Sequence, residues 1–156
     1  MRVVLTAFLL CVISGCTDAP PPVVDRIELR LSGWSAVDIT VSRQGASSYH
    51  LSDPPPAGKG GIFSLTPQQF ENLLRRLEPY RKTAVSFTDA SAEKFVLSEC
   101  PRGVPFVTDQ GAFYVRWIGR TSDQHYLADL GCDSTRLEAR NKDLLAIAQS
   151  LPVPLD

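Results

Sequence analysis

Apolar and polar residues alternate in the first part of the chain, which is the pattern of half-buried strands. The alternation runs over 26–31, returns over 37–42 and appears more briefly over 48–51. A stretch rich in proline and glycine follows over 53–61 and predicts a long break in regular structure. The pattern therefore predicts three strands before the break.

Apolar residues then recur at helical spacing in two places. Thr66 and Pro67 are typical of a helix start, and we expect the first helix to end at Pro79. The second helix closes the chain, with a cap near Asn141 and a stop at Pro152. The positions expected to face the sheet are Phe70, Leu73, Leu74 and Leu77, then Leu144, Leu145, Ala148 and Leu151.

The middle of the chain predicts further short strands. Two apolar runs, 85–87 and 104–108, are expected to be strands, and 93–98 fits either a strand or a helix. A turn at 109–111 precedes a strong hairpin pattern made by 112–119 and 124–130. Together these elements predict an α+β fold: an antiparallel β-sheet packed against two helices, in a single domain over 25–156.

The hairpin allows one geometric step. If its loop is centred on 121–122, Trp117 faces Tyr126 and Val115 faces Ala128, so this face belongs to the core. The opposite face carries Tyr114, Arg116, Ile118, His125, Leu127 and Asp129.

That opposite face has two interpretations. Tyr114, Arg116, His125 and Asp129 together predict a binding face, with a rigid aromatic ring, a cation and a histidine. A solvated face with an Arg–Asp pair would have the same composition, because antiparallel sheets commonly leave one face in water.

A small basic cluster lies at the end of the first predicted helix. Its members are Arg75, Arg76, Arg81 and Lys82. Positive charge is favourable near the negative end of a helix dipole, and a phosphate or lipid-headgroup site is the alternative.

Familiar catalytic and cofactor motifs are absent from the sequence. It contains no HExxH, Cys/His cluster, P-loop, GxSxG or GxGxxG pattern, so we predict no catalytic residue, metal or cofactor. His125 and Asp129 lie four residues apart on a strand, about 13 Å, too far for a direct hydrogen bond. An envelope hydrolase stays open only as an alternative function.

The N-terminus begins with a short apolar segment over 3–13. A spanning helix needs about 20 such residues, so the segment fits a secretory signal instead. The residues Ile13-Ser14-Gly15-Cys16 resemble the lipobox of bacterial lipoproteins. The resemblance implies a signal peptide over 1–15 and a lipid-carrying Cys16.

The segment after this cysteine predicts a tether. Residues 16–24 include three consecutive prolines, which favour an extended spacer. By resemblance to the sorting of Gram-negative lipoproteins, Thr17 implies the outer membrane, with the domain facing the periplasm. Without the signal, the chain has a net charge of −2 and no basic stripe, which excludes a nucleic-acid partner.

The four cysteines then separate into different roles. Cys11 leaves with the signal and Cys16 carries lipid, so Cys100 and Cys132 remain as one pair in an oxidising compartment. We therefore expect a disulfide between them.

Two further resemblances bear on function. The segment 60–66, followed by Phe70, Leu73 and Leu77, is similar to small envelope lipoproteins with no assigned activity. Cys100-Pro101-Arg102-Gly103, before a hairpin that ends at Cys132, resembles the reactive loop of Streptomyces-type subtilisin inhibitors. That resemblance implies cleavage-site recognition at Arg102-Gly103 by a trypsin-like protease.

The sequence as a whole predicts a non-enzymatic, lipid-anchored domain of the cell envelope. The expected partners are the membrane, through the anchor, and a protein of the envelope. The protease inhibitor with a loop over 100–104 is the second hypothesis.

Overall fold

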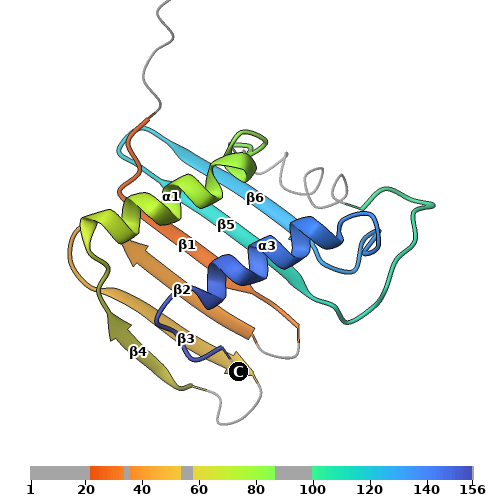
Figure 1. The fold of residues 1–156 in the computed structure, drawn as a ribbon, viewed down its shortest axis with the longest axis horizontal. Helices are drawn as coiled ribbons and strands as arrows, with labels where there is room; N and C mark the ends of the chain where they lie inside the picture. The colour runs from red at the N-terminus through yellow and green to blue at the C-terminus, as the bar shows by residue number, and fades with distance from the viewer. Residues whose placement is uncertain (1–21, 34–35, 54–57, 87–99, 156) are drawn as a thin grey trace, which may run out of the picture.

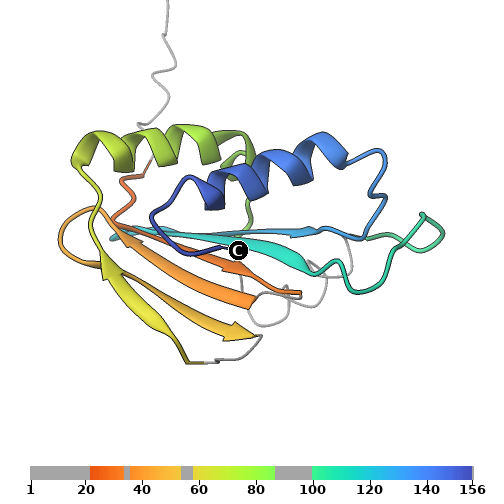
Figure 2. The ribbon, with the colours of Figure 1, turned by 60° about the horizontal axis from the view of Figure 1, so that its bottom comes forward.

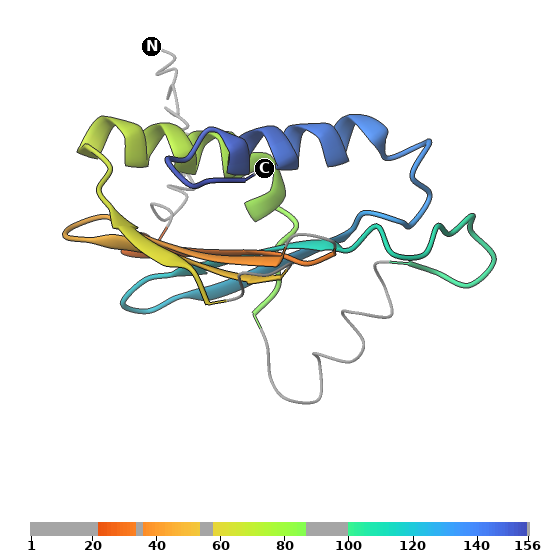
Figure 3. The same cartoon turned by 90° about the horizontal axis from the view of Figure 1, so that it is seen from below.

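The computed structural model describes residues 22–33, 36–53, 58–86 and 100–155. Within these ranges, six antiparallel strands form one sheet in the order β4-β3-β2-β1-β5-β6. The strands are β1 (Arg26–Leu31), β2 (Ala36–Ser42), β3 (Ser47–Asp53), β4 (Gly60–Phe63), β5 (Ala112–Ile118) and β6 (Asp123–Asp129), and the helices are α1 (Pro67–Arg81) and α3 (Glu138–Gln149). Figures 2 and 3 show both helices on the same face of the sheet, which confirms the α+β prediction.

The topology places the N-terminal strand at the centre of the sheet. Strands β1 to β4 form a meander, and β5 returns to pair with the other edge of β1, so that Leu29 pairs with both Ile39 and Val115. Strand β6 then pairs with β5. Residues far apart in sequence therefore lie side by side on β1 and β5.

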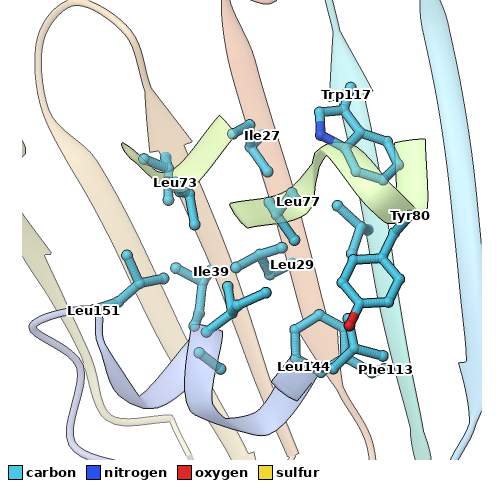
Figure 4. Packing of buried hydrophobic residues seen from close by; sticks show 14 of the residues in the cluster. Ile27, Leu29, Ile39, Leu73, Leu77, Tyr80, Phe113, Trp117, Leu144 and Leu151 are labelled. Atoms are coloured by element: carbon cyan, nitrogen blue, oxygen red, sulfur yellow. The ribbon is translucent and has the colours of Figure 1, made fainter. Parts of the chain in front are cut away.

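The core fills the space between the sheet and the two helices (Figure 4). The alternating residues of the strands point one apolar set toward α1 and α3, and Ile27, Phe113 and Trp117 are fully buried there. On α1 the buried residues are Phe70, Leu73, Leu77 and Tyr80, and on α3 they are Leu144, Ile147 and Ala148. This face of the sheet therefore provides most of the buried apolar area that stabilises the fold.

The prediction that α1 ends at Pro79 is wrong. The helix begins as expected, with Thr66 and Gln69 forming a reciprocal capping box, but it continues to Arg81. Pro79 lies in the last turn, where the lost N–H disturbs a single hydrogen bond near the helix end. The next turn still closes, since the Lys82 N–H donates to the Glu78 carbonyl at 3.2 Å.

Helix α3 starts before its predicted cap. It begins at Glu138, and the backbone N–H of Asn141 already donates to the Leu137 carbonyl at 2.9 Å. The Asn141 side chain donates instead to the Leu130 carbonyl at 3.0 Å and ties the helix to the end of β6. Leu145, predicted to face the core, is exposed, and Ile147 is buried.

The prediction of a break over 53–61 is wrong at its end, where a strand begins. Gly60–Phe63 forms β4 at the edge of the sheet, next to β3. A Cβ atom on Gly60 would lie 2.7 Å from the Tyr49 carbonyl oxygen, and one on Gly61 would lie 2.6 Å from the Tyr49 ring, so the backbone contact favours glycine at position 60. These two glycines reflect close packing in a strand and not the break that the sequence predicts.

The segment predicted as a strand at 104–108 is a loop instead. Its Phe106 makes one isolated bridge to Cys132, and the Val107 N–H donates to the Gly131 carbonyl at 3.0 Å. Pro105 has no N–H to donate to a ladder, which favours an irregular path. Of the other strand candidates, Val85 makes an isolated bridge to His125, whereas Phe87 and 93–98 lie outside the described residues.

The predicted disulfide is confirmed. Cys100 and Cys132 are bonded, with Cα atoms 5.5 Å apart and a separation of 32 positions in sequence. The bond joins the loop before β5 to the segment just after β6.

Candidate binding face

Side chains on the face of the sheet opposite α1 and α3, here called the distal face, form rows across neighbouring strands. In order across the sheet, the first row is Ile62, Ser48, Thr40, Glu28, Arg116 and His125, the second is Gly60, His50, Asp38, Arg30, Tyr114 and Leu127, and the third is Ser42, Arg26, Ile118 and Asp123. Most of these side chains are polar. The distal face is therefore chemically unlike the apolar face beneath the helices.

A connected polar cluster lies where β1, β5 and β6 run side by side. The Arg116 guanidinium donates twice to the Asp123 carboxylate, at 2.8 and 2.7 Å, and once to Glu28, at 3.3 Å. The ring of His125 joins this network through Nε2, which lies 3.1 Å from Asp123 Oδ1. Tyr114 completes it, with its hydroxyl 2.5 Å from His125 Nδ1.

The backbone holds this cluster in place on both sides. The His125 N–H donates to the Val85 carbonyl at 2.8 Å, and the Val85 N–H donates back at 2.9 Å. Arg116 pairs across the sheet with Glu28 on one side and His125 on the other. The geometry of the side chains therefore follows from the strand register.

Burial and the hydrogen bonds of Arg116 set the protonation states of the cluster. Burial lowers the pKa of His125, and this effect outweighs the opposing attraction of Asp123. Hydrogen bonds from Arg116 lower the pKa of Asp123, and burial raises the pKa of Tyr114. At neutral pH the cluster therefore contains a neutral imidazole, a carboxylate and a protonated phenol.

These charge states fix the direction of the hydrogen bonds. Asp123 is an acceptor only, so His125 donates to it through Nε2–H and is left with an acceptor at Nδ1. Tyr114 then donates its hydroxyl proton to Nδ1. The order of hydroxyl, imidazole and carboxylate resembles that of a nucleophilic triad, with a tyrosine in the place of the nucleophile and with its pKa raised by burial.

The rest of the distal face continues toward β4. Arg30 forms an ion pair with Asp38, which raises the pKa of the arginine. His50 and Ser48 are exposed beyond this pair, and Ile62 at the edge is 78% exposed. The face thus combines a partly buried polar cluster on β5 and β6 with exposed polar and aliphatic groups on β3 and β4.

Three of the four predicted face residues come together in the structure. Tyr114, Arg116 and His125 are all members of the polar cluster. Asp129 is not, since its Oδ1 accepts the N–H groups of Gly131 and Cys132 at 2.9 and 3.2 Å. Asp129 therefore shapes the turn that leads to the disulfide.

The register predicted for the hairpin is wrong by two residues. Trp117 pairs with Gln124 and Val115 with Tyr126, because the loop is centred on 120–121 and closes through the Gly119 N–H to the Ser122 carbonyl at 2.8 Å. A shift of two keeps every side chain on its predicted face.

The same shift explains which residues the sequence prediction missed. In the observed register Asp123 lies diagonally across from Arg116. The predicted register placed a different residue at that position. Glu28 was missed because nothing in its own strand pattern indicates that β5 pairs with β1. Its alternation with apolar neighbours does correctly indicate its face.

The predicted inhibitory loop lies outside this face. Pro101, Arg102 and Gly103 are all exposed, and the Val104 N–H approaches the Pro101 carbonyl at 3.4 Å to form a turn. Gly103 has a φ of 90°, which favours glycine at this position. The loop is fixed on one side by the disulfide bond of Cys100.

Neither a metal-binding group nor a similar protein identifies a function for the described part of the chain. Among the described residues, no group of three or more His, Cys, Asp and Glu side chains is placed to hold a metal ion, and no helix in these ranges is long and apolar enough to span a membrane. No protein-family model, curated protein or solved structure matches the chain. Its function must therefore be inferred from its own residues.

Proposed function

We propose that the chain is a lipid-anchored binding protein of the bacterial cell envelope, held in the outer membrane through Cys16, and that its distal face binds a protein partner. The observation that carries this proposal is the polar cluster of Glu28, Tyr114, Arg116, Asp123 and His125, which is already assembled on a rigid sheet.

A preassembled surface favours binding because less side-chain freedom is lost when the partner arrives. The bidentate contact between Arg116 and Asp123 holds a guanidinium plane in one orientation, and Tyr114 adds a rigid aromatic ring. Tyrosine and arginine are the residue types enriched at protein interfaces. In the three rows, three arginines and three carboxylates balance in charge, which suits a polar protein surface better than a polyanion.

The anchor is tested on the full chain in a bacterial host. We expect incorporation of radiolabelled palmitate and a shift of the processed protein to the membrane fraction. The Cys16→Ser variant should lose both, whereas Cys11→Ser should keep both. Palmitate incorporation that persists in Cys16→Ser would contradict the anchor.

The distal face is tested by crosslinking in the intact envelope. A photoreactive phenylalanine analogue replaces Ser48, which is exposed on the distal face, or Glu78, which is exposed on α1. We expect a discrete crosslinked band from position 48 and none from position 78. Equal crosslinking from both positions would show that the distal face has no special role.

Protease inhibition remains a second candidate, favoured by the exposed Arg102 on a disulfide-held loop. This hypothesis predicts that the oxidised protein inhibits a trypsin-like protease and that Arg102→Ala abolishes inhibition. Arg136→Ala, another exposed arginine after the disulfide, is the matched control.

A further inference from the structure

The point where the N-terminal tether joins the domain is fixed by three contacts. Arg81 Nη2 donates to the Pro22 carbonyl at 3.0 Å, and Arg43 Nε donates to the Val24 carbonyl at 2.7 Å. Gly119 packs so closely on Val23 that a Cβ atom there would lie 2.1 Å from the Val23 carbonyl oxygen. Val24 itself is buried in the core, so the tether ends at this point instead of continuing as a free linker.

The distance from this junction to the lipid is short. Five residues, 17–21, separate Cys16 from Pro22. Even a fully extended chain spans at most about 3.6 Å per residue, so Pro22 lies within about 20 Å of an acylated Cys16. This is less than the diameter of a small domain, and the end of the molecule around Pro22 must therefore be the end nearest the membrane.

That end, here called the tether end, carries five basic side chains. They are Arg26 at the start of β1, Arg43 after β2, Arg81 and Lys82 at the end of α1, and Arg120 in the β5–β6 loop. The acidic residues beside them are Asp25, Glu28, Glu71 and Asp123; Glu28 is paired with Arg26 at 3.1 Å, and Glu71 is paired with Arg43 at 2.5 Å. Lys82 and Arg120 are exposed.

Figures 1 and 3 show the described start of the chain toward one end of the molecule and the loop 100–111 at the other. We propose that the tether end rests on the membrane, with Arg120 and Lys82 in contact with anionic lipid headgroups, so that the disulfide-held loop points away from the bilayer. The proposal rests on the lipid anchor proposed above. Charge complementarity between basic side chains and an anionic surface supplies the attraction, at about 1 kcal/mol per side chain, or about fivefold in the docked population.

The experiment uses the full lipoprotein in vesicles of phosphatidylcholine, with or without phosphatidylglycerol. A single cysteine is introduced as Thr121→Cys beside Arg120, or as Thr108→Cys in the distant loop. It is the only free thiol, since Cys16 is acylated and Cys100 is bonded to Cys132. A fluorophore on that thiol is quenched by lipids that carry a nitroxide on the headgroup.

We expect strong quenching at position 121 and weak quenching at position 108 in anionic vesicles. Quenching at 121 should fall in neutral vesicles and in about 1 M salt, where the screening length is about 3 Å. Equal quenching at the two positions, or quenching at 121 that ignores lipid charge and salt, would overturn the proposal.

Charge-removing variants identify the contact residues. The double variant Lys82→Gln/Arg120→Gln should lower the ratio of docked to undocked domain about 25-fold, as two independent charges of about fivefold each. The matched control Arg136→Gln/Lys142→Gln removes two exposed charges beyond β6, from the segment before α3 and from α3 itself, and should leave quenching unchanged. Equal effects of the two pairs would exclude a specific basic contact.

Vesicle flotation separates this proposal from the anchor. Protein that fails to float with neutral vesicles contradicts lipidation at Cys16, and with it the proposed function. Protein that floats but shows no difference between positions 121 and 108 contradicts only the orientation.

Discussion

The two faces of the sheet are built from the same strands but differ in chemistry. Beneath α1 and α3, side chains such as Phe113 and Trp117 are fully buried and apolar. On the distal face, the neighbouring residues Tyr114 and Arg116 enter a network of charges and hydrogen bonds. The comparison teaches that the alternation of the strands separates the apolar residues that stabilise the fold from a polar network on the other face.

The largest expected difference between the faces comes from removing one large side chain from each. Phe113→Ala should lower the free energy of unfolding by about 3–5 kcal/mol, because it leaves a cavity beneath the helices. Ile62→Ala on the distal face should change it by less than about 0.5 kcal/mol, since this side chain is 78% exposed. Chemical denaturation measures both, and similar losses would contradict the division between the faces.

The next largest loss in the free energy of unfolding should come from removing the disulfide, which belongs to neither face. Replacing both cysteines, Cys100→Ser with Cys132→Ser, should lower the free energy of unfolding by about 3–4 kcal/mol through the larger entropy of the unfolded chain. The polar cluster should survive this change. Reduction that instead broadens the NMR signals of His125 and Tyr114 would show that the loop supports the distal face.

Within the distal face, the hydrogen bond of Tyr114 should have a modest effect. Tyr114→Phe removes the donor to His125 Nδ1 and should lower the free energy of unfolding by about 1 kcal/mol. Without that donor the neutral imidazole is less favoured, so the pKa of His125 should rise, as an NMR titration would show. Tyr49→Phe, on the opposite side of the sheet, is the control and should leave this titration unchanged.

The pH dependence of stability should also come from the distal face. The pKa of His125 is lowered in the folded protein by burial, and that of Asp123 is lowered by Arg116. The unfolded chain therefore binds protons first, and the free energy of unfolding should fall as the pH drops below about 6.5 and again near pH 4.

The control for this prediction is His125→Gln, which should flatten the curve between pH 7 and 5 while keeping the fall near pH 4. Denaturation at a series of pH values measures the slope. Identical slopes for the variant and the original chain would assign the upper part of the curve to another group.

The contrast between the faces also explains what could be predicted from the sequence. Alternation assigns each residue to a face, so the core position of Phe113 and the distal position of Tyr114 were both predictable. Register depends instead on the backbone of the hairpin loop, where the Gly119 N–H bonds to the Ser122 carbonyl, and no side-chain pattern indicates this contact. The cluster residue Asp123 was missed for that reason.

The end of α1 and the edge strand β4 were harder to predict, because each depends on a local contact. Pro79 lies in the last turn of α1, where a proline disturbs a single hydrogen bond, and the helix continues to Arg81. Gly60 and Gly61 have the composition of a loop, although in β4 the close approach of the Tyr49 backbone favours glycine at position 60.

The central claim is that the polar cluster organises a binding face, and one measurement tests it directly. The yield of the crosslink from position 48 is compared between the original chain, Arg116→Gln and Arg136→Gln. Ser48 and Arg116 lie in the same row across the sheet, and Arg136 is on the segment before α3. We predict that Arg116→Gln abolishes the crosslink while Arg136→Gln leaves it unchanged, with both variants folded and membrane-bound. A crosslink that survives Arg116→Gln at full yield would contradict the account.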